Sequence, residues 1–201
     1  MRMIDLTHKL YNKMPVYPGD PPVKIGEIKN HHMDEYSLYK FQGNMHMGTH
    51  LDAPYHFQKG GRKISDLKLN ELIQKARIID VDSKKIKVKH LKFLNDEKVI
   101  IFRTGWSSKW GKDEYFIKNP YLSSKCANYL VELCVKGIGI DAPSVDPFGD
   151  TSNHKTLLSH DIWILENLTN LDKIYHDQFK IYIIPLLLET ESSPVRAFAD
   201  L

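Results

Sequence analysis

The chain has 201 residues, of which 42% are hydrophobic and 26% are charged, and its formal net charge is +3. This length allows one well-buried core and is short for two full domains, and the composition excludes fibrous and disordered proteins. The densest basic run, residues 84–89, alternates with apolar residues, which indicates the solvated face of an edge strand rather than a nucleic-acid surface. We therefore expect one domain over residues 1–201 and no nucleic-acid partner.

The expected compartment follows from the N-terminus, the apolar runs and the cysteines. Asp5 comes too early for the apolar region of a signal peptide, and the longest apolar run, residues 181–188, is interrupted by Pro185 and too short to span a membrane. Cys126 and Cys134 lie in a predicted helix, about 12 Å apart along its axis, which is too far for a disulfide. We therefore expect two buried free thiols in a cytoplasmic protein without a membrane partner.

The predicted elements are mostly strands at first and alternate with helices later. Apolar and β-branched runs predict strands over residues 4–6, 23–28, 36–47, 76–81, 98–104, 137–140, 162–165 and 180–188. Helical spacing of apolar residues, or a shorter stretch compatible with it, predicts helices over residues 67–74, 124–136 and 152–159. This order is typical of a mixed α/β domain. Gly137 is expected in the C-cap position of the 124–136 helix.

A proline-rich segment, residues 15–22, separates the first two predicted strands. Its four prolines prevent central-strand pairing and helix formation, and they lower the entropy that the segment loses on ordering. We expect an ordered loop or arm that reaches over a neighbouring subunit or a pocket.

The stretch richest in chemistry carries His46, His50 and Asp52 at even positions. If it begins as a strand, the period of two puts these side chains on one face, and Gly48 leaves open space between the two imidazoles. A helix would also bring the two histidines together, but the glycine and a nearby proline argue against it. In either geometry, two neutral ring nitrogens and one carboxylate converge.

This set of ligands suits zinc or manganese. A hydrolytic site keeps a coordination position open for water, and the metal lowers the pKa of that water and polarises a substrate carbonyl. His56 follows Pro54, so it need not obey the strand's parity, and it is the candidate for moving protons to the leaving amine. The alternative, capped or surface histidines, is disfavoured because three polar groups on one face are costly to bury unpaired.

A second segment supplies two more candidate ligands. Glu166 ends an apolar strand, where an acid has no packing purpose and where α/β proteins place ligands. His154 lies near the start of a short predicted helix, after Thr151 and Ser152 as candidate caps. For Glu166, a functional role and simple surface exposure both stay open.

The residues from His46 to Phe57 read H-x-G-T-H-x-D-x-P-x-H-F. This run closely resembles the signature of the metal-dependent cyclase family, which includes bacterial kynurenine formamidases and isatin hydrolases. Further segments resemble other motifs of that family in the same order, namely residues 16–20, 103–106, 139–146, 153–168 and 193–197.

The resemblance implies a swivelling β/β/α fold with a mixed sheet, a homodimer or higher homo-oligomer, and a centre of two Zn or Mn ions per subunit. By position it implies that His46 and His50 bind one metal and that His154 binds the other. Asp52 and Glu166 would be the bridging carboxylates, and His56 would carry the proton. His160 matches no ligand position and is interpreted as a helix C-terminal histidine, which the helix dipole favours.

The function implied by the resemblance is an arylformamidase that hydrolyses N-formylkynurenine to kynurenine and formate in tryptophan catabolism. Two departures keep alternatives open. Tyr17 stands where kynurenine formamidases usually carry Trp, and residues 189–194 replace a Gly-Asp-Gly turn. Tyr17 would still stack on an aromatic substrate, with less ring area and an added hydroxyl. The alternatives are the same machinery acting on another lactam, cyclic imide or lactone, and a non-catalytic metal or small-molecule binding protein.

Overall fold

The computed structural model describes residues 2–92, 94 and 97–201. Its strands are β1 (Met3–Asp5), β2 (Lys24–Lys29), β3 (Leu38–Gln42), β4 (His50–Asp52), β5 (Ile73–Asp80), β6 (Lys85–Ile86), β7 (Val99–Arg103), β8 (Tyr121–Leu122), β9 (Gly137–Ile140), β10 (Trp163–Glu166), β11 (Gln178–Pro185) and β12 (Ser192–Asp200). Its α-helices are α1 (His31–Asp34), α2 (Leu69–Leu72), α3 (Glu114–Ile117), α4 (Ser124–Glu132) and α5 (Ser152–Leu158). Its 3-10 helices are η1 (Pro54–His56), η2 (Ile64–Asp66), η3 (Val88–Leu91), η4 (Trp106–Lys109) and η5 (Leu171–Lys173).

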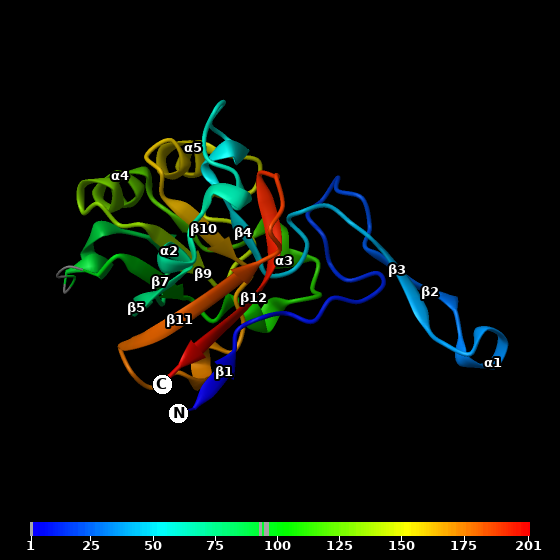
Figure 1. Cartoon of the computed structure of the whole chain (residues 1–201). Helices are drawn as coiled ribbons and strands as arrows, with labels where there is room; N and C mark the ends of the chain where they lie inside the picture. The colour runs from blue at the N-terminus through cyan, green and yellow to red at the C-terminus, as the bar shows by residue number, and fades with distance from the viewer. Residues whose placement is uncertain (1, 93, 95–96) are drawn as a thin grey trace.

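Seven strands close into a barrel. Their order is β12-β11-β5-β7-β9-β10-β4, and β4 pairs back onto β12, whereas β1 pairs with β12 outside this ring. The pairs β5–β7, β7–β9 and β9–β10 are parallel and the others in the ring are antiparallel. Helices α4 and α5 cover one side of the barrel (Figure 1). The predicted mixed α/β fold is confirmed.

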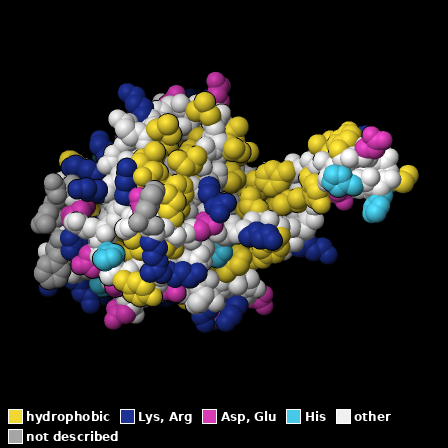
Figure 2. All heavy atoms as spheres, turned by 60° about the horizontal axis from the view of Figure 1, so that its bottom comes forward, with side chains coloured by type: hydrophobic (Ala, Val, Ile, Leu, Met, Phe, Trp, Pro, Cys, Tyr) yellow, Lys and Arg dark blue, Asp and Glu magenta, His cyan; other side chains and the backbone are white. Residues whose placement is uncertain are grey.

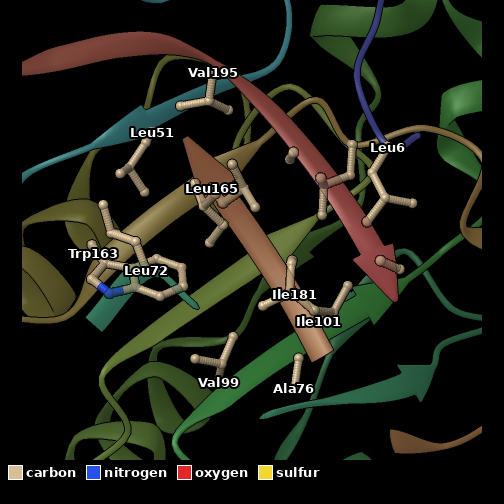
Figure 3. Close-up of a cluster of buried hydrophobic side chains, with 14 of the residues drawn as sticks. Leu6, Leu51, Leu72, Ala76, Val99, Ile101, Trp163, Leu165, Ile181 and Val195 are labelled. Carbon is tan, nitrogen blue, oxygen red and sulfur yellow. The ribbon is translucent and has the colours of Figure 1, made fainter. Parts of the chain in front are cut away.

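The parallel strands separate two hydrophobic cores by their period of two. On β7, Val99 and Ile101 belong to the cluster inside the barrel, which Figure 3 shows, whereas Ile100 and Phe102 belong to the cluster shared with α4 and α5. β9 follows the same alternation with glycines on its inner face. A Cβ on Gly137 would lie 2.1 Å from the indole ring of Trp163, so this strand leaves the space that the indole fills.

Helix α4 follows the predicted apolar spacing but ends earlier than predicted. The Ser123 side chain accepts a hydrogen bond from the amide of Cys126 at 3.2 Å, and Cys126 and Leu130 are buried. Cys134 takes the left-handed backbone conformation after the helix (φ 52°), and Gly137 is the first residue of β9, so the prediction of Gly137 as C-cap was wrong. Cys134 is also exposed, and only the prediction of a buried Cys126 thiol is confirmed.

Two other predicted elements differ from the structure. The helix expected over residues 67–74 is the four-residue α2, because β5 already begins at residue 73 and takes the chain into the barrel. The strand expected over residues 36–47 ends at Gln42, and the chain then turns toward β4. No helix within the described residues is long and apolar enough to cross a membrane.

Strands β2 and β3 form a hairpin that projects from the barrel, with α1 at its tip (Figure 1). Every residue of β3 is exposed, and α1 buries none of its residues. Figure 2 shows hydrophobic side chains along this hairpin and where it joins the body. An isolated two-stranded hairpin is only marginally stable in water and usually needs further packing. The exposed residues of β3 and α1 lack such packing within the chain.

Candidate metal centre and active site

The candidate centre lies on the outer face of the barrel at β4 and β10. Leu51 and Leu165 point into the barrel core, so the period of two turns His50, Asp52 and Glu166 to the opposite face. Glu166 is paired in register with His50 across the two strands. Their exposed fractions are 2% for His50, 0% for Asp52 and 3% for Glu166, which excludes the alternative of a surface position for Glu166.

His46 reaches the centre from a turn and not from a strand. Its Nδ1 lies 3.0 Å from Oδ1 of Asp52, so the predicted grouping is found, but strand periodicity is not its cause. The turn depends on Gly48, which has φ +60° and where a Cβ would lie 2.6 Å from a methyl of Leu10. The Gly48 carbonyl accepts a hydrogen bond from Nδ1 of His50 at 2.9 Å, so Gly48 sets the orientation of the His50 ring rather than leaving a gap between imidazoles.

The two buried carboxylates both extend from His50 to His154. Oδ1 of Asp52 lies 3.7 Å from Nε2 of His50, and its Oδ2 lies 3.6 Å from Nε2 of His154. Oε2 of Glu166 lies 3.5 Å from the same atom of His50, and its Oε1 lies 3.3 Å from that of His154. Each carboxylate therefore directs one oxygen toward each histidine.

The donor set fits a divalent cation. Both carboxylate oxygens of Asp52 are fully buried, and their charged or polar neighbours among the described residues are the imidazoles of His46, His50 and His154. The described residues that line the cavity here include the carboxylates Asp20, Asp52, Asp150 and Glu166, and no Lys or Arg. Because buried charges need a partner, a cation among these oxygen and imidazole donors satisfies them.

Potential ligand atoms form two groups that share Asp52. One group contains His46, Asp52 and His56, and the other contains His50, Asp52 and Glu166; within each, the atoms lie within 4.8 Å of one another. Burial disfavours the charged form of His46, but the carboxylate of Asp52 outweighs it and raises the pKa of His46 to about 10. The same negative potential would attract a metal cation to this position.

His56 occupies a different electrostatic environment. Pro54 ends β4 and starts the 3-10 turn η1, which places the His56 ring 4.3 Å from that of His46 and 6.0 Å from that of His154. Burial lowers the pKa of His56 to about 4, so its imidazole is neutral at neutral pH. A neutral imidazole can accept a proton or bind a metal, and the position of His56 allows either role.

A cavity of about 240 Å³ opens over the centre, and Tyr17 and Asp20 line it. The Tyr17 ring lies 5.9 Å from that of Phe116 on α3 and 5.5 Å from that of Phe148, and its hydroxyl accepts a hydrogen bond from the amide of Gly149 at 3.4 Å. Of the two expected positions for residues 15–22, the structure shows the one over a pocket. The cavity thus combines polar donors at its base with aromatic rings at its wall.

Comparison with known proteins identifies the family. Residues 4–147 match the family model described as "Putative cyclase". The chain belongs to the cyclase family. Curated relatives include the kynurenine formamidase of Bacillus cytotoxicus, which is 36% identical over 201 residues that cover 96% of this chain and 95% of the relative. The kynurenine formamidase of Bacillus anthracis is 34% identical over 203 residues, with coverage of 98% and 96%.

Solved structures of similar fold include hydrolases. A "predicted metal-dependent hydrolase" from Bacillus stearothermophilus superimposes with a TM-score of 0.82 at 26% identity, covering 98% of this chain and 97% of the other. Isatin hydrolase A from Labrenzia aggregata, bound to benzyl benzoate, gives a TM-score of 0.88 at 20% identity, with coverage of 98% and 93%. The second similarity shows the shared fold alone.

Several contacts around the centre of this cyclase-family chain were not predicted from the sequence. Thr151 makes no side-chain cap at the start of α5, and the carboxylate of Asp146 accepts the hydrogen bonds there instead, so the expected cap was wrong. Oε1 of Glu191 lies 3.5 Å from Nε2 of His46. Asn167 adopts φ +56°, which Asn tolerates, and donates to the Gly48 carbonyl at 2.9 Å. None of these residues follows a ligand spacing that would have singled it out.

His160 behaves as the sequence predicts. It is exposed just beyond the end of α5, and its Nδ1 lies 2.7 Å from the carbonyl oxygen of Thr156 in the last turn. This contact lets the imidazole donate to a carbonyl that has no partner within the helix. The side chain is therefore accounted for without a role in the centre.

Proposed function

We propose that this chain is a metal-dependent arylformamidase that hydrolyses N-formylkynurenine to kynurenine and formate. One observation carries the proposal: two fully buried carboxylates, Asp52 and Glu166, share histidine neighbours beneath an aromatic-walled cavity. The similarity to kynurenine formamidases over nearly the whole chain supports the choice of substrate.

We further propose that the centre holds two divalent ions, Zn or Mn. His46 and His50 would bind one ion and His154 the other, and Asp52 and Glu166 would span both. This assignment is supported by the way in which each carboxylate directs one oxygen to His50 and one to His154. When bound, the ions would supply Lewis acidity, which lowers the pKa of water and stabilises the negative charge that develops on a substrate carbonyl oxygen.

The protein's own residues would then position the substrate and move the proton. The Tyr17 and Phe116 rings lie at the cavity wall, where they would stack on the aryl group of the substrate. His56, neutral because burial lowers its pKa to about 4, would take the proton from the attacking water and return it to the leaving amine nitrogen. Hydrolysis breaks the formyl C–N bond, so this amine is the first product and formate is the second.

The deciding experiment measures N-formylkynurenine hydrolysis by protein that has been stripped with a chelator and reloaded with Zn²⁺ or Mn²⁺. We expect turnover to return with at least one ion and to track the bound metal. Protein that carries two ions and hydrolyses nothing with either metal would contradict the arylformamidase assignment.

Tyr17 favours a second set of substrates. Its ring presents a smaller surface than the Trp usual in kynurenine formamidases, and its hydroxyl accepts a hydrogen bond from the amide of Gly149. The same centre could then open a lactam, cyclic imide or lactone, and a panel of these compounds should follow a negative formamidase result. Metal-loaded protein that binds but hydrolyses none of them would be a non-catalytic binding protein.

We propose that the chain forms a homodimer through the β2–β3 hairpin. The register pairs Ile25 with Phe41 and Glu27 with Tyr39, so these side chains share one face, and Lys40 lies on the other. Tyr39 is 60% exposed and Phe41 48%. A hairpin with exposed aromatic residues on one face requires a partner surface for stable packing.

The size of the exposed surface supports a second copy as that partner. A compact monomer of 23.3 kDa is expected to expose about 9,700 Å², whereas this chain exposes 10817 Å². The excess of about 1,100 Å² is of the order of the ~800 Å² that each partner buries in a standard interface. Two-fold dimers are also the commonest oligomers, and they would let each hairpin pack on the other subunit.

We also propose a cytoplasmic location. Cys126 and Cys134 are both free thiols, and Cys134 is exposed to solvent, which suits a reducing compartment. Cell fractionation with an antibody against the chain tests this location, and its recovery with secreted proteins would contradict it.

A further inference from the structure

The carboxylate of Asp146 makes three contacts at the start of α5. Its Oδ1 accepts a hydrogen bond from the amide of Asn153 at 2.8 Å, and its Oδ2 accepts one from the amide of His154 at 3.0 Å. The same Oδ2 lies 2.7 Å from Nδ1 of the His154 ring. Asp146 is 0% exposed, so no water competes for these contacts. One side chain therefore caps the helix and holds the ring of a candidate metal ligand.

The contact to the ring decides which nitrogen of His154 faces the centre. A carboxylate accepts but cannot donate, so Nδ1 must carry the proton when it bonds to Asp146. Nε2 is then left without a proton in the neutral ring, and it is Nε2 that lies 3.3 Å from Glu166 and 3.6 Å from Asp52. A carboxylate behind a ligating histidine fixes its tautomer and its orientation in this way.

The adjacent residue orients the other ligand on this side of the centre. The backbone amide of Val145 donates to Oε1 of Glu166 at 3.0 Å. This oxygen is the one that lies near Nε2 of His154. Two consecutive residues, Val145 and Asp146, therefore hold the carboxylate and the imidazole that converge on one position.

Two buried amide side chains hold the short loop that carries these residues. Nδ2 of Asn119, which is 1% exposed, donates to the carbonyl oxygens of Ser144 at 3.1 Å and Asp146 at 2.9 Å. Nδ2 of Asn153 donates to the carbonyl oxygen of Val145 at 3.1 Å. Each carbonyl of residues 144–146 is thus bonded to a buried amide, and the loop has little freedom to move.

We propose that Asp146 is a positioning residue that keeps His154 in the Nδ1-protonated tautomer with Nε2 directed at the metal, on a loop held in place by Asn119. The inference rests on the proposed function of the centre as a metal site, but not on the identity of its substrate. It makes metal affinity, rather than turnover alone, the property that depends on Asp146.

The test replaces Asp146 with Asn and measures Zn²⁺ affinity by competition with a chromophoric chelator. The Asn side-chain oxygen can still accept from the amide of Asn153, but the variant loses the charged second oxygen that holds the His154 ring. We expect Zn²⁺ affinity to fall about 10- to 100-fold with the far-UV circular dichroism retained. The matched control is Asp66→Asn, because the Asp66 side chain also accepts a backbone hydrogen bond, from the amide of Lys63 at 2.8 Å, but does not line the cavity over the centre. We expect the control to keep the affinity of the wild type.

Equal Zn²⁺ affinity in Asp146→Asn and wild type would overturn the proposal, as would an equal loss in both variants. Should Asp146→Asn not fold, ¹⁵N-histidine NMR of the Zn²⁺-loaded wild type decides instead. A proton on Nδ1 of His154 supports the proposal, and a proton on Nε2 overturns it. If wild-type protein binds Zn²⁺ but hydrolyses no formamide, the arylformamidase assignment is wrong. The Zn²⁺ affinity and the position of the His154 proton would still test the role of Asp146.

Discussion

His46 and His56 are neighbouring imidazoles with opposite acid–base behaviour. Their ring centroids lie 4.3 Å apart, and both rings are largely buried. Burial opposes the charge on each ring, but only His46 contacts the carboxylate of Asp52, at 3.0 Å, which raises its pKa to about 10. Burial instead dominates at His56 and lowers its pKa to about 4. Contact with the Asp52 carboxylate therefore explains why His46 favours the positively charged form whereas His56 stays neutral.

The role of His56 can be separated from that of a ligand by His56→Ala. We expect this variant to keep its metal content and to lose about 100- to 10,000-fold in kcat, because only the proton carrier is removed. Metal content is measured by elemental analysis and kcat with N-formylkynurenine. His160→Ala, which removes an exposed histidine at the end of α5, should leave both values unchanged. A loss of one ion in His56→Ala would instead make His56 a ligand, as its 4.8 Å group with His46 and Asp52 allows.

His8 predicts a pH dependence of stability. Its ring stacks on Trp110 with centroids 4.1 Å apart, and its buried Nε2 has no hydrogen-bond partner among the described residues. Burial lowers the pKa of His8 to about 4, below the ordinary value of about 6.5. Between these two values the unfolded chain binds a proton that the folded protein does not, so the free energy of unfolding decreases as the pH falls through this window.

Urea denaturation at pH 7 and pH 5 checks this effect. We expect wild type to lose about 1 to 2 kcal/mol more than His8→Phe between the two values, after allowance for the partial exposure of the ring. Phe keeps the stacking contact with Trp110 but cannot bind a proton. Groups that titrate in both proteins cancel in the difference. Equal losses would show that His8 binds its proton as readily in the folded protein as in the unfolded chain.

At the scale of elements, sequence patterns predicted strands best where a run of residues was uniformly apolar. The apolar runs that became β7, β9 and β10 were predicted because each strand has hydrophobic layers on both faces. Strand β12 was missed because Ser192, Ser193 and Pro194 at its start hide the later alternation of Val195 and Ala197. Propensity alone could not show that these residues pair with β4 across the barrel.

In the candidate centre too, residues that follow a local sequence pattern were predicted, whereas residues that act through tertiary contacts were not. His50, Asp52 and Glu166 were predicted to share a site, and the structure brings them together from two paired strands. Asp146 was not singled out, because its contacts with His154 arise from a loop and a helix that meet only in the folded chain. The spacing of the candidate ligands is therefore recognisable in the sequence, whereas the groups that orient these candidates are not.

The inner face of β9 offers a test of packing at this scale. In Gly137→Ala the new methyl would lie 2.1 Å from the Trp163 ring, and we expect a loss of about 1 to 3 kcal/mol in the free energy of unfolding. Gly26→Ala is the matched control, since nothing lies within 4 Å of its Cβ position, and we expect it to be close to neutral. The double variant Gly137→Ala/Trp163→Phe should recover part of the loss by removing the crowded ring. Equal stability of the two single alanine variants would show that the indole can move aside.

At the scale of the whole molecule, the β2–β3 hairpin predicts the oligomeric state. Light scattering coupled to size exclusion should give twice the 23.3 kDa mass for wild type. The double variant Tyr39→Ser/Phe41→Ser should shift toward the monomer, because it removes aromatic side chains from the exposed face of β3. Lys40→Ser changes the opposite face of the same strand and should remain dimeric. A dimer that survives the double variant would place the interface elsewhere.

The shortest strand of the barrel, β4, lies between the two strands at which the barrel closes. β4 contains only three residues, yet it is hydrogen-bonded to β10 on one side and to β12 on the other. A strand with partners on both edges cannot fray independently, so its amides exchange with deuterated solvent only through large openings of the barrel. His50 and Asp52 should therefore show slow hydrogen–deuterium exchange although a cavity opens over them. The centre and the barrel would then unfold as a single cooperative unit.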